Sequence, residues 1–569
     1  MFDINSFNYK IKSIRKNSIF NLAGIAQRQS NCLVNSRSLV QFQLSALIKQ
    51  IKMVNKILKF RYLWKLFVFI PLLFYFGKRS YIAFDEGFYA LQARWILEKG
   101  NWTIPLWWDE YVLDRTIGLQ FLIAKSQDLF GRNIFFAYLP TTVASIFMLF
   151  ATYKLHEELF NKKYAIISPL ILATTYLWFD YSHLATQDIV YSSLVTIGVL
   201  ALVKIKSKKN KFYILLFGIW IGLAFMMKTF LVFVPLLSLI PYIFFKKNFL
   251  FIKFFWLGLL IGFIPFLFWT FSINPYLDKN IIFYLVEKFN FLSSKNTFTN
   301  PFYYYFWNLP VTFLPWSFFA IIGTIYNISQ NKENKYILAF FPLILIATLS
   351  IFSTKTPYYT LQISSIFSLN TYLGIKYIFN SYRYSRFFIF ITSKIIPLFI
   401  VALTFTYYFF FKNSINFNTK ENTFIILGLL SFGLSWSFIK HKNSFKKILI
   451  TLIIGPYLFT SFILQSGLFT DRSRELREKM EYVSSLDLVK NQTIMVDKNG
   501  INNSETQSKI IRISLLTPKL GGGLESINQL KKSELAWTTD LKTIKSNDDS
   551  FEMIYENDVL DPWKLILKK

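Results

Sequence analysis

The chain has 569 residues, of which 53% are hydrophobic and 20% aromatic. An ordinary soluble domain is about 45–50% apolar, so this composition indicates a polytopic membrane protein. The net charge of +31 comes from lysines and arginines that stand in short clusters between apolar runs. Such clusters mark the cytoplasmic ends of membrane spans, which argues against nucleic acid as a partner.

The first 52 residues differ from the rest of the chain. The stretch GIAQRQSNCLVNSRSLVQFQLSA has no helical or strand period and no apolar core of a signal peptide. It resembles the peptides obtained when a transfer RNA gene is translated, so we expect the functional protein to start near Met53; a disordered cytoplasmic tail is the alternative. The one cysteine, Cys32, lies in this leader and excludes internal disulfides and any cysteine-built metal site.

Thirteen apolar segments follow that could each cross a bilayer, which requires ~20 apolar residues with a range of about 17–25. The segments are 62–78, 134–154, 164–179, 185–204, 212–227, 229–245, 251–272, 308–328, 336–353, 359–379, 387–411, 422–440 and 446–466. We therefore expect an all-α polytopic membrane protein with about 13 transmembrane helices.

Cations between the segments predict the orientation, because Lys and Arg are retained on the cytoplasmic side. With the N-terminus inside, every inner connection is basic, whereas the outer connection DYSHLA has no cation. The inner cations are Lys162, Lys163, Lys204, Lys206, Lys208, Lys209, Lys211, Lys246, Lys247, Lys332, Lys335, Lys376, Arg383, Arg386, Lys440, Lys442, Lys446 and Lys447. An odd number of spans places the C-terminus outside.

Three regions extend beyond the membrane on the outer side: residues 79–133, residues 273–307 and the tail from 467. The tail contains short apolar runs such as IIRISLL and the turn KLGGGLES, which predict a small α/β appendage. The expected organisation is a leader (1–52), a membrane domain (53–466) and an extracytoplasmic C-terminal domain (467–569).

The first outer loop predicts an amphipathic helix. Phe84, Phe88, Leu91 and Trp95 recur at helical spacing, while the other face carries Asp85, Gln92 and charged neighbours. A helix of this kind is expected to lie along the membrane surface.

Ionisable side chains from distant segments converge on the outer face in this topology. They are Asp85, Glu86, Arg115, Asp188, Lys228 and Lys355, with Tyr359 beside the last. A charge at membrane depth costs ~2.5–3.5 kcal/mol or more on insertion scales, so Asp188 needs a partner or a cavity.

Each of these residues also has a simpler explanation. Lys228 and Lys355 could be lysines that extend from helix ends to the membrane surface. Asp188 could only cap its helix, where the dipole favours a carboxylate, and the acidic pair after the first span could be a solvated turn. His183 could bind a metal ion, although a lone histidine is more often a hydrogen-bonded interface residue.

Taken together, the motifs resemble membrane glycosyltransferases of the GT-C fold. The stretches FDEGFYALQARWILEKGNWTIPLW, YVLDRTIGLQFLIAKSQDLFGRNIFFAYLPTTVAS, LATQDIVYSSL, GLAFMMKTFLVFVPL, NLPVTFLPWSFF and SIFSTKTPYYTL occur in the family's order. The resemblance is closest to bacterial lipid A aminoarabinose transferases, which are similar to protein O-mannosyltransferases, and it covers residues 62–380.

The resemblance implies catalytic roles for three carboxylates. Asp85 becomes the catalytic base, Asp188 the second acid beneath it, and Glu86 a supporting carboxylate that holds the loop together with Arg94. Phe88 stands where the lipid A enzymes have a basic residue, which is a departure at a position relevant to the substrate.

Three cations and a tyrosine are the expected binding site for the donor phosphate: Arg115, Lys228, Lys355 and Tyr359. Each departs locally from the family pattern. Asp114-Arg115-Thr116 replaces a Glu-Lys-Pro element, and Thr229-Phe230 replaces a Gly-Pro that follows the lysine in many relatives. In the Lys-x-Pro-x-Tyr element, Tyr358 replaces a frequent His and Gln362 a frequent Pro.

The implied activity is transfer of a sugar from a polyprenyl phosphate to lipid A, another envelope glycan or protein. No cofactor is required by the sequence, although a divalent cation could bridge carboxylates and phosphate. The expected location is the bacterial inner membrane. A transporter or lipid-linked sugar flippase is the alternative, but it predicts internal repeats and a midplane site, and an oligosaccharide polymerase or ligase would not be expected to carry this first-loop pattern.

Overall fold

The computed structural model describes residues 64–246, 249–294, 299–330, 332–411, 418–440, 443–540 and 550–569. The chain divides into two units, Met1–Val68 and Phe69–Lys569, and the described residues of the first are 64–68, which contain helix α3 (Trp64–Phe67). The expected leader with Cys32 and the expected start at Met53 lie outside the described residues, as do Lys247 and Lys442 of the predicted inner connections.

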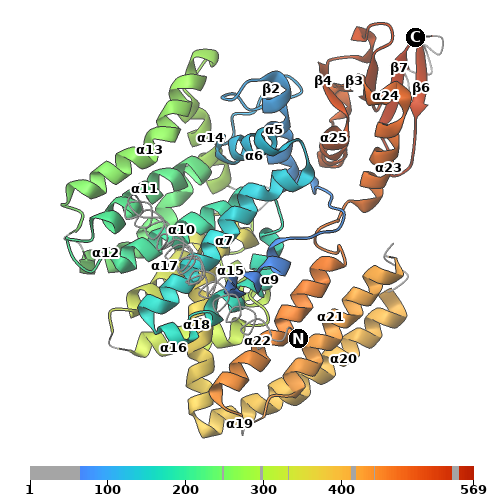
Figure 1. Ribbon diagram of the computed structural model, residues 1–569. Coiled ribbons are helices and arrows are strands. Elements are labelled where there is room, and N and C mark those ends of the chain that lie inside the picture. Colours follow the sequence, from blue (N-terminus) through green and yellow to red (C-terminus); the bar gives the residue numbers. More distant parts are fainter. Residues whose placement is uncertain are drawn as a thin grey trace, which may run out of the picture. The chain divides into compact units, whose positions relative to one another are not determined.

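Helices dominate the second unit (Figure 1). Their bounds are α4 (Ile70–Leu73), α7 (Ile134–Leu159), α8 (Ile167–Ala173), α9 (Tyr176–Tyr181), α10 (Gln187–Lys204), α11 (Lys211–Lys228), α12 (Phe233–Lys246), α13 (Lys253–Ile273), α14 (Ile281–Ser293), α15 (Tyr304–Thr312), α16 (Ser317–Ser329), α17 (Phe341–Ile351), α18 (Leu361–Asn380), α19 (Tyr382–Phe390), α20 (Ile396–Thr406), α21 (Thr419–Ser437) and α22 (Phe445–Gln465).

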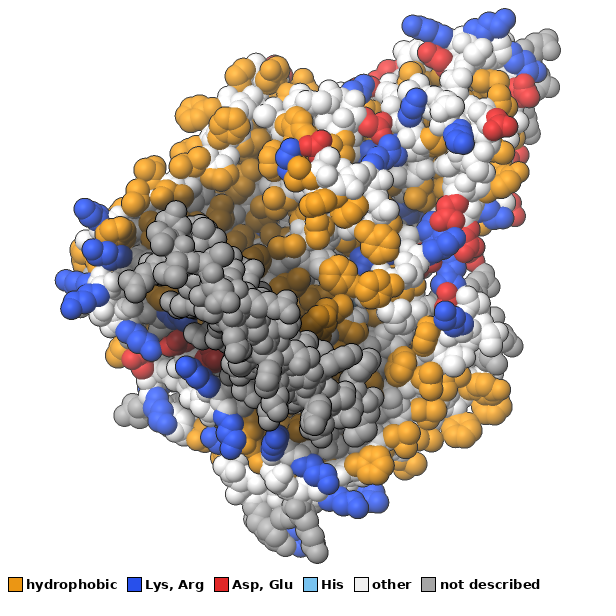
Figure 2. Space-filling model, in the orientation of Figure 1, with side chains coloured by type: hydrophobic (Ala, Val, Ile, Leu, Met, Phe, Trp, Pro, Cys, Tyr) orange, Lys and Arg blue, Asp and Glu red, His pale blue; other side chains and the backbone are white. Residues whose placement is uncertain are grey.

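Within the described residues, six helices are long and apolar enough to cross a membrane, or seven if the bent pair α15 and α16 is one span. Large apolar side chains stand exposed along these helices, for example Trp256, Leu260, Ile264 and Phe268 at four-residue spacing on α13. Figure 2 shows hydrophobic side chains over much of the helical face. The chain is therefore a multi-pass membrane protein, while the count of thirteen spans stays a prediction.

Helices α11 and α13 pack through glycines. A Cβ atom added to Gly222 would lie 2.2 Å from the backbone carbon of Gly262, and one added to Gly218 would lie 2.4 Å from the carbonyl oxygen of Phe255. Small residues allow such close approach of membrane helices. The contact fixes the position of α11, whose last residue is Lys228.

The first outer loop contains α5 (Phe88–Lys99), the short hairpin β1 (Leu106–Trp107) and β2 (Glu110–Tyr111), and α6 (Gly118–Phe130). The predicted helix exists, but it begins at Phe88, so Asp85 lies in the turn before it.

The expected environment of the apolar stripe on α5 is wrong. Leu91 and Trp95 are both 0% exposed and pack in one cluster with Leu476 and Met480 of the C-terminal region. Periodicity identifies an apolar face, and here another part of the protein covers that face instead of lipid.

The C-terminal region forms a five-stranded sheet with helices, as expected for a small α/β appendage (Figure 1). The strand order is β4-β3-β5-β7-β6, in which β3 is parallel to β4 and β5, and β7 is antiparallel to β5 and β6. The bounds are α23 (Arg474–Ser485), α24 (Asp487–Lys490), β3 (Thr493–Asp497), α25 (Ser504–Leu516), β4 (Lys519–Leu524), β5 (Leu535–Thr538), β6 (Phe551–Tyr555) and β7 (Lys564–Lys568).

Candidate functional site

A tight turn presents Asp85. Its backbone has φ 65° and ψ −86°, a left-handed conformation that is uncommon for a residue other than glycine and is concentrated at functional sites. The amide of Gly87 donates to the carbonyl of Ile82 (3.0 Å) and the amide of Ile82 donates to the Glu86 carboxylate (2.7 Å). These two bonds close the turn, so the strained residue is held by its neighbours.

Glu86 points inward from the same turn. It is 1% exposed, and its Oε2 accepts a hydrogen bond from the amide of Ala185 (3.2 Å), just before α10. Burial raises the pKa of Glu86 to about 7, although the amides of Ile82 and Ala185 oppose the shift. The acidic pair is thus divided: Asp85 is half-buried, whereas Glu86 ties the loop to the membrane helices.

Asp188 and Lys228 form an ion pair. Asp188 lies in the first turn of α10, and its carboxylate accepts a hydrogen bond from Nζ of Lys228 at the end of α11. The same Nζ lies 4.9 Å from the ring centre of Tyr358 and 5.6 Å from that of Tyr359. Lys228 therefore faces an internal acid and two aromatic rings, which is not the environment of a lysine that extends to the membrane surface.

The residue after Lys228 bears on one departure from the family pattern. Thr229 has φ 43°, a left-handed conformation that favours glycine. The family pattern expected from the sequence has glycine at this position, and the positive φ of Thr229 is a backbone conformation that glycine adopts more easily.

Electrostatics connect Asp85 to this pair. Burial and the neighbouring carboxylate of Asp188 raise the pKa of Asp85 to about 6, while the positive charges of Lys228 and Arg115 act in the opposite direction. A carboxyl group with this pKa can accept a proton near neutral pH, as a general base must.

Arg115 lies in the same outer loop, between β2 and α6. Its guanidinium donates to both carboxylate oxygens of Asp114 (2.9 and 2.6 Å) and lies 4.2 Å from the ring centre of Phe88. Nζ of Lys288, on α14, lies 3.4 Å from the Asp114 carboxylate. Sequence reasoning missed Lys288; the signal for it was a cation within the amphipathic part of the second outer loop.

Lys355 and Tyr359 have different environments. Lys355 is 4% exposed, and its amine donates to the carbonyls of Asn300 (2.8 Å) and Phe352 (2.5 Å). Tyr359 lies in the short helix η7 (Pro357–Thr360), close to Lys228. The structure thus brings Asp85, Asp188, Lys228, Arg115 and Tyr359 together, whereas Lys355 contacts the backbone of adjacent loops.

Arg94 contacts the C-terminal region. Its guanidinium donates to Glu98 (2.7 Å) and to the carbonyls of Ser514 and Pro518, the latter at 3.1 Å. The side chain expected to hold the loop thus joins α5 to the end of α25, and its supporting role stays a prediction.

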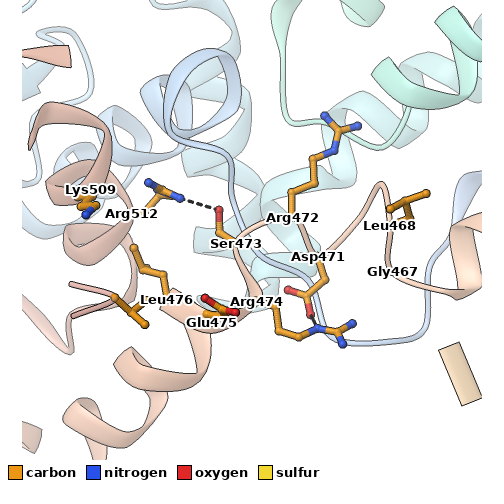
Figure 3. Close-up of a pocket in the computed structure, with 11 residues that line it drawn as sticks. Gly467, Leu468, Asp471, Arg472, Ser473, Arg474, Glu475, Leu476, Lys509 and Arg512 are labelled. Atoms are coloured by element: carbon orange, nitrogen blue, oxygen red, sulfur yellow. Dashed lines mark hydrogen bonds and ion pairs between the residues drawn. The ribbon is translucent and has the colours of Figure 1, made fainter. Parts of the chain in front are cut away.

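A cavity of about 440 Å³ follows the end of α22 and is lined by Arg472, Ser473, Lys509 and Arg512, among others (Figure 3). Arg512 donates to the Ser473 hydroxyl (3.0 Å), while Arg472 points away from Arg512 and pairs with Asp180 of α9. The charged stretch DRSRELRE, in which arginines and acidic residues alternate, was the sequence signal for Arg472 and its neighbours, whereas Lys509 and Arg512 had no such signal. None of the predicted site residues lines this cavity.

His183 is buried, and its Nδ1 lies 2.6 Å from the carbonyl of Phe179, an environment that fits a hydrogen-bonded interface histidine. Across the described part of the chain, no group of three or more His, Cys, Asp and Glu side chains is placed to hold a metal ion.

Comparison with known sequences finds relatives. The family described as dolichyl-phosphate-mannose-protein mannosyltransferase matches residues 114–270. The undecaprenyl phosphate-alpha-4-amino-4-deoxy-L-arabinose arabinosyl transferase of Wigglesworthia glossinidia brevipalpis is 27% identical over 325 residues, which is 54% of this chain and 57% of that protein. The protein of the same name from Shewanella sediminis is 25% identical over 270 residues, 44% of this chain and 49% of the relative. The chain thus spans about half the length of these curated relatives.

Comparison with solved structures identifies the fold. The crystal structure of ArnT from Cupriavidus metallidurans bound to undecaprenyl phosphate matches with a TM-score of 0.69 at 13% identity, over 90% of this chain and 98% of that chain. Its apo state gives 0.67 at 12% identity, over 91% and 98%. These structures confirm the GT-C fold, and the family and sequence matches confirm the resemblance to glycosyltransferases of that fold. None of the proteins named here is a transporter.

Proposed function

We propose that this chain is an integral-membrane glycosyltransferase that moves a sugar from a polyprenyl phosphate to an envelope acceptor. The observation that carries the proposal is the half-buried Asp85, held in a left-handed turn beside the ion pair of Asp188 and Lys228. A carboxyl group with a raised pKa next to a cation suits a reaction that removes a proton and releases a phosphate.

In the proposed reaction, Asp85 accepts the proton of an acceptor hydroxyl or phosphate. The acceptor oxygen then attacks the anomeric carbon of the sugar, and the bond from that carbon to the phosphate oxygen breaks. The electron pair leaves with the polyprenyl phosphate. Proton transfer of this kind typically contributes 10²–10⁴-fold to the rate.

Lys228 and Arg115 are proposed to stabilise the leaving phosphate, with Tyr359 beside them. Lys228 would divide its donors between Asp188 and the phosphate, and Arg115 would offer its planar fork. Lys355 already donates to two carbonyls, so we expect it to act mainly by shaping the loop before Tyr359.

The donor class follows from the relatives. Curated relatives carry the name of an undecaprenyl phosphate amino-arabinose transferase, and a solved structure of the same fold contains undecaprenyl phosphate. Undecaprenyl phosphate amino-arabinose is therefore the first donor to test. The acceptor could be lipid A, another glycan or a protein, and Phe88 in place of a basic residue argues for testing all three.

The experiment uses the purified full chain with a panel of radiolabelled polyprenyl-phosphate sugars and three acceptor preparations, with Mg²⁺ or with EDTA. We expect one donor to transfer label to one acceptor, and Asp85→Asn to abolish the transfer. A transporter or flippase would instead move labelled lipid across a vesicle membrane without forming a new glycoside, and that result would overturn the proposal.

A further inference from the structure

The turn that carries Asp85 contacts the C-terminal region directly. At Gly87 an added Cβ atom would lie 3.0 Å from Cγ2 of Ile511 and 2.7 Å from the carbonyl oxygen of Ile82. Ile511 belongs to α25 and is 0% exposed. Its side chain therefore fills the space beside the backbone two residues after Asp85, and the turn has no room to move in that direction.

Two arginines of the first outer loop bind the C-terminal end of the same helix. Arg94 donates to the carbonyls of Ser514 and Pro518, and Arg132 donates to the carbonyls of Thr517 (3.2 Å) and Pro518 (3.1 Å). The last carbonyls of a helix lack partners within the helix and carry partial negative charge, so they favour cationic donors.

Glu98 completes the connection. One of its oxygens accepts from Arg94 (2.7 Å) and Arg132 (3.0 Å), and the other accepts from the amide of Leu520 (2.8 Å) at the start of β4. The three side chains form a latch between α5 and the end of α25. Because α5 begins directly after the Asp85 turn, the latch and Ile511 hold the turn from two directions.

We propose that the C-terminal α/β region is a positioning element for Asp85, in which α25 places Ile511 against the turn and binds α5 through Arg94. The inference rests on the proposed role of Asp85 as the base. A left-handed backbone at a non-glycine residue persists only when its surroundings enforce it, and α25 supplies that support. The α/β region then serves the reaction without touching the substrate.

The test compares two truncations of buried isoleucines in the full chain. Ile511→Ala removes the contact with Gly87. Ile566→Ala, in β7, removes the same side-chain atoms from the separate apolar cluster that contains Leu524 and Ala536. Both should weaken the C-terminal region, but only the first should loosen the turn.

Hydrogen exchange gives a readout that does not depend on activity. In Ile511→Ala, the amides of residues 82–88 should exchange at least about tenfold faster than in the wild type, whereas Ile566→Ala should leave them unchanged. Equal exchange in both variants would overturn the proposal. If wild-type protein transfers no sugar, the proposed function fails while this measurement still tests the support of the turn.

Kinetics give the second readout. Turnover of Ile511→Ala should fall by between about tenfold and ~10²-fold with an unchanged donor KM, because a small displacement of a catalytic group costs rate more than binding. Ile511→Val, which keeps Cγ2, should recover most of the turnover. If Ile511→Ala does not fold, Arg94→Gln replaces it with the same expectations, and normal turnover and exchange in that variant contradict the proposal.

Discussion

Nζ of Lys228, at the end of α11, contacts the carboxylate of Asp188 in the first turn of α10. Both side chains are largely buried, with exposed fractions of 12% and 6%. Two buried charges of opposite sign stabilise one another, and removal of either one leaves the other without a partner at high cost.

The first prediction concerns this pair. Lys228→Met and Asp188→Asn should each lower the thermal stability of the purified protein, by about 3–5 kcal/mol for the loss of a buried partner. In the double variant, the loss of stability should be smaller than the sum of the two single losses, because no charge remains unpaired. Thermal unfolding of the four proteins measures the coupling, and strictly additive losses would contradict it.

A second prediction concerns Asp85 and pH. Asp85→Asn keeps the shape of the side chain but cannot accept a proton, so turnover should fall by at least ~10²-fold. In the wild type, the rate should rise with pH and reach half its plateau near the pKa of about 6, because the base must be ionised. A near-normal rate in the variant, or a rate that falls as pH rises through 6, excludes the role.

The same shift predicts a stability effect. Because folding raises the pKa of Asp85 from 3.8 to about 6, its protonated form favours the folded state, and that contribution is lost as pH rises from about 4 through 6. Asp85→Asn should therefore have a higher Tm than the wild type at pH 7.5, and the difference should vanish near pH 4. Glu98→Gln is the control, because no gain in Tm at pH 7.5 is expected when this second carboxylate of the loop is neutralised.

Sequence patterns predicted that side chains from distant segments lie on one face, because the topology of the spans alone places them there. Apolar lengths and basic clusters placed Asp188 and Lys228 on the same face of the membrane, and the structure pairs them. The order of motifs predicted the fold that the structural comparison confirms.

The support of Asp85 could not be predicted in the same way. Ile511 is one of many isoleucines in the sequence, and Arg94 binds backbone carbonyls, which have no signature in the sequence. The apolar period of α5 identified a buried face, but a period is the same whether lipid or protein covers it, so Leu91 and Trp95 were assigned to the membrane surface.

Orientation supplies a fourth prediction. We expect the loop between α10 and α11 inside and the C-terminal region outside, from the distribution of cations. In a Cys32→Ser background, an impermeant thiol reagent should label Lys532→Cys in intact cells but label Lys209→Cys only after permeabilisation; both positions are exposed. Labelling at 209 and not at 532 in intact cells would invert the topology.

The last prediction separates the cations of the proposed phosphate site. Arg115→Ala should weaken donor binding several-fold or more, since a hydrogen bond to a charged group is worth ~1.5–3 kcal/mol, and Arg115→Lys should keep part of the affinity. Lys355→Ala should instead lower stability, because the carbonyls of Asn300 and Phe352 lose a donor, and leave binding per folded molecule close to normal.

Lys279→Ala is the matched control for these variants, because Lys279 is an exposed cation between α13 and α14. Lys279→Ala changes the net charge by the same amount and should change neither donor binding nor stability. Binding of polyprenyl phosphate to each variant, normalised to folded protein, makes the comparison. A contrary result would be normal binding of polyprenyl phosphate to Arg115→Ala and weakened binding to Lys355→Ala. The phosphate would then lie against the loop before Tyr359, and Lys355 would stabilise the leaving group in place of Arg115.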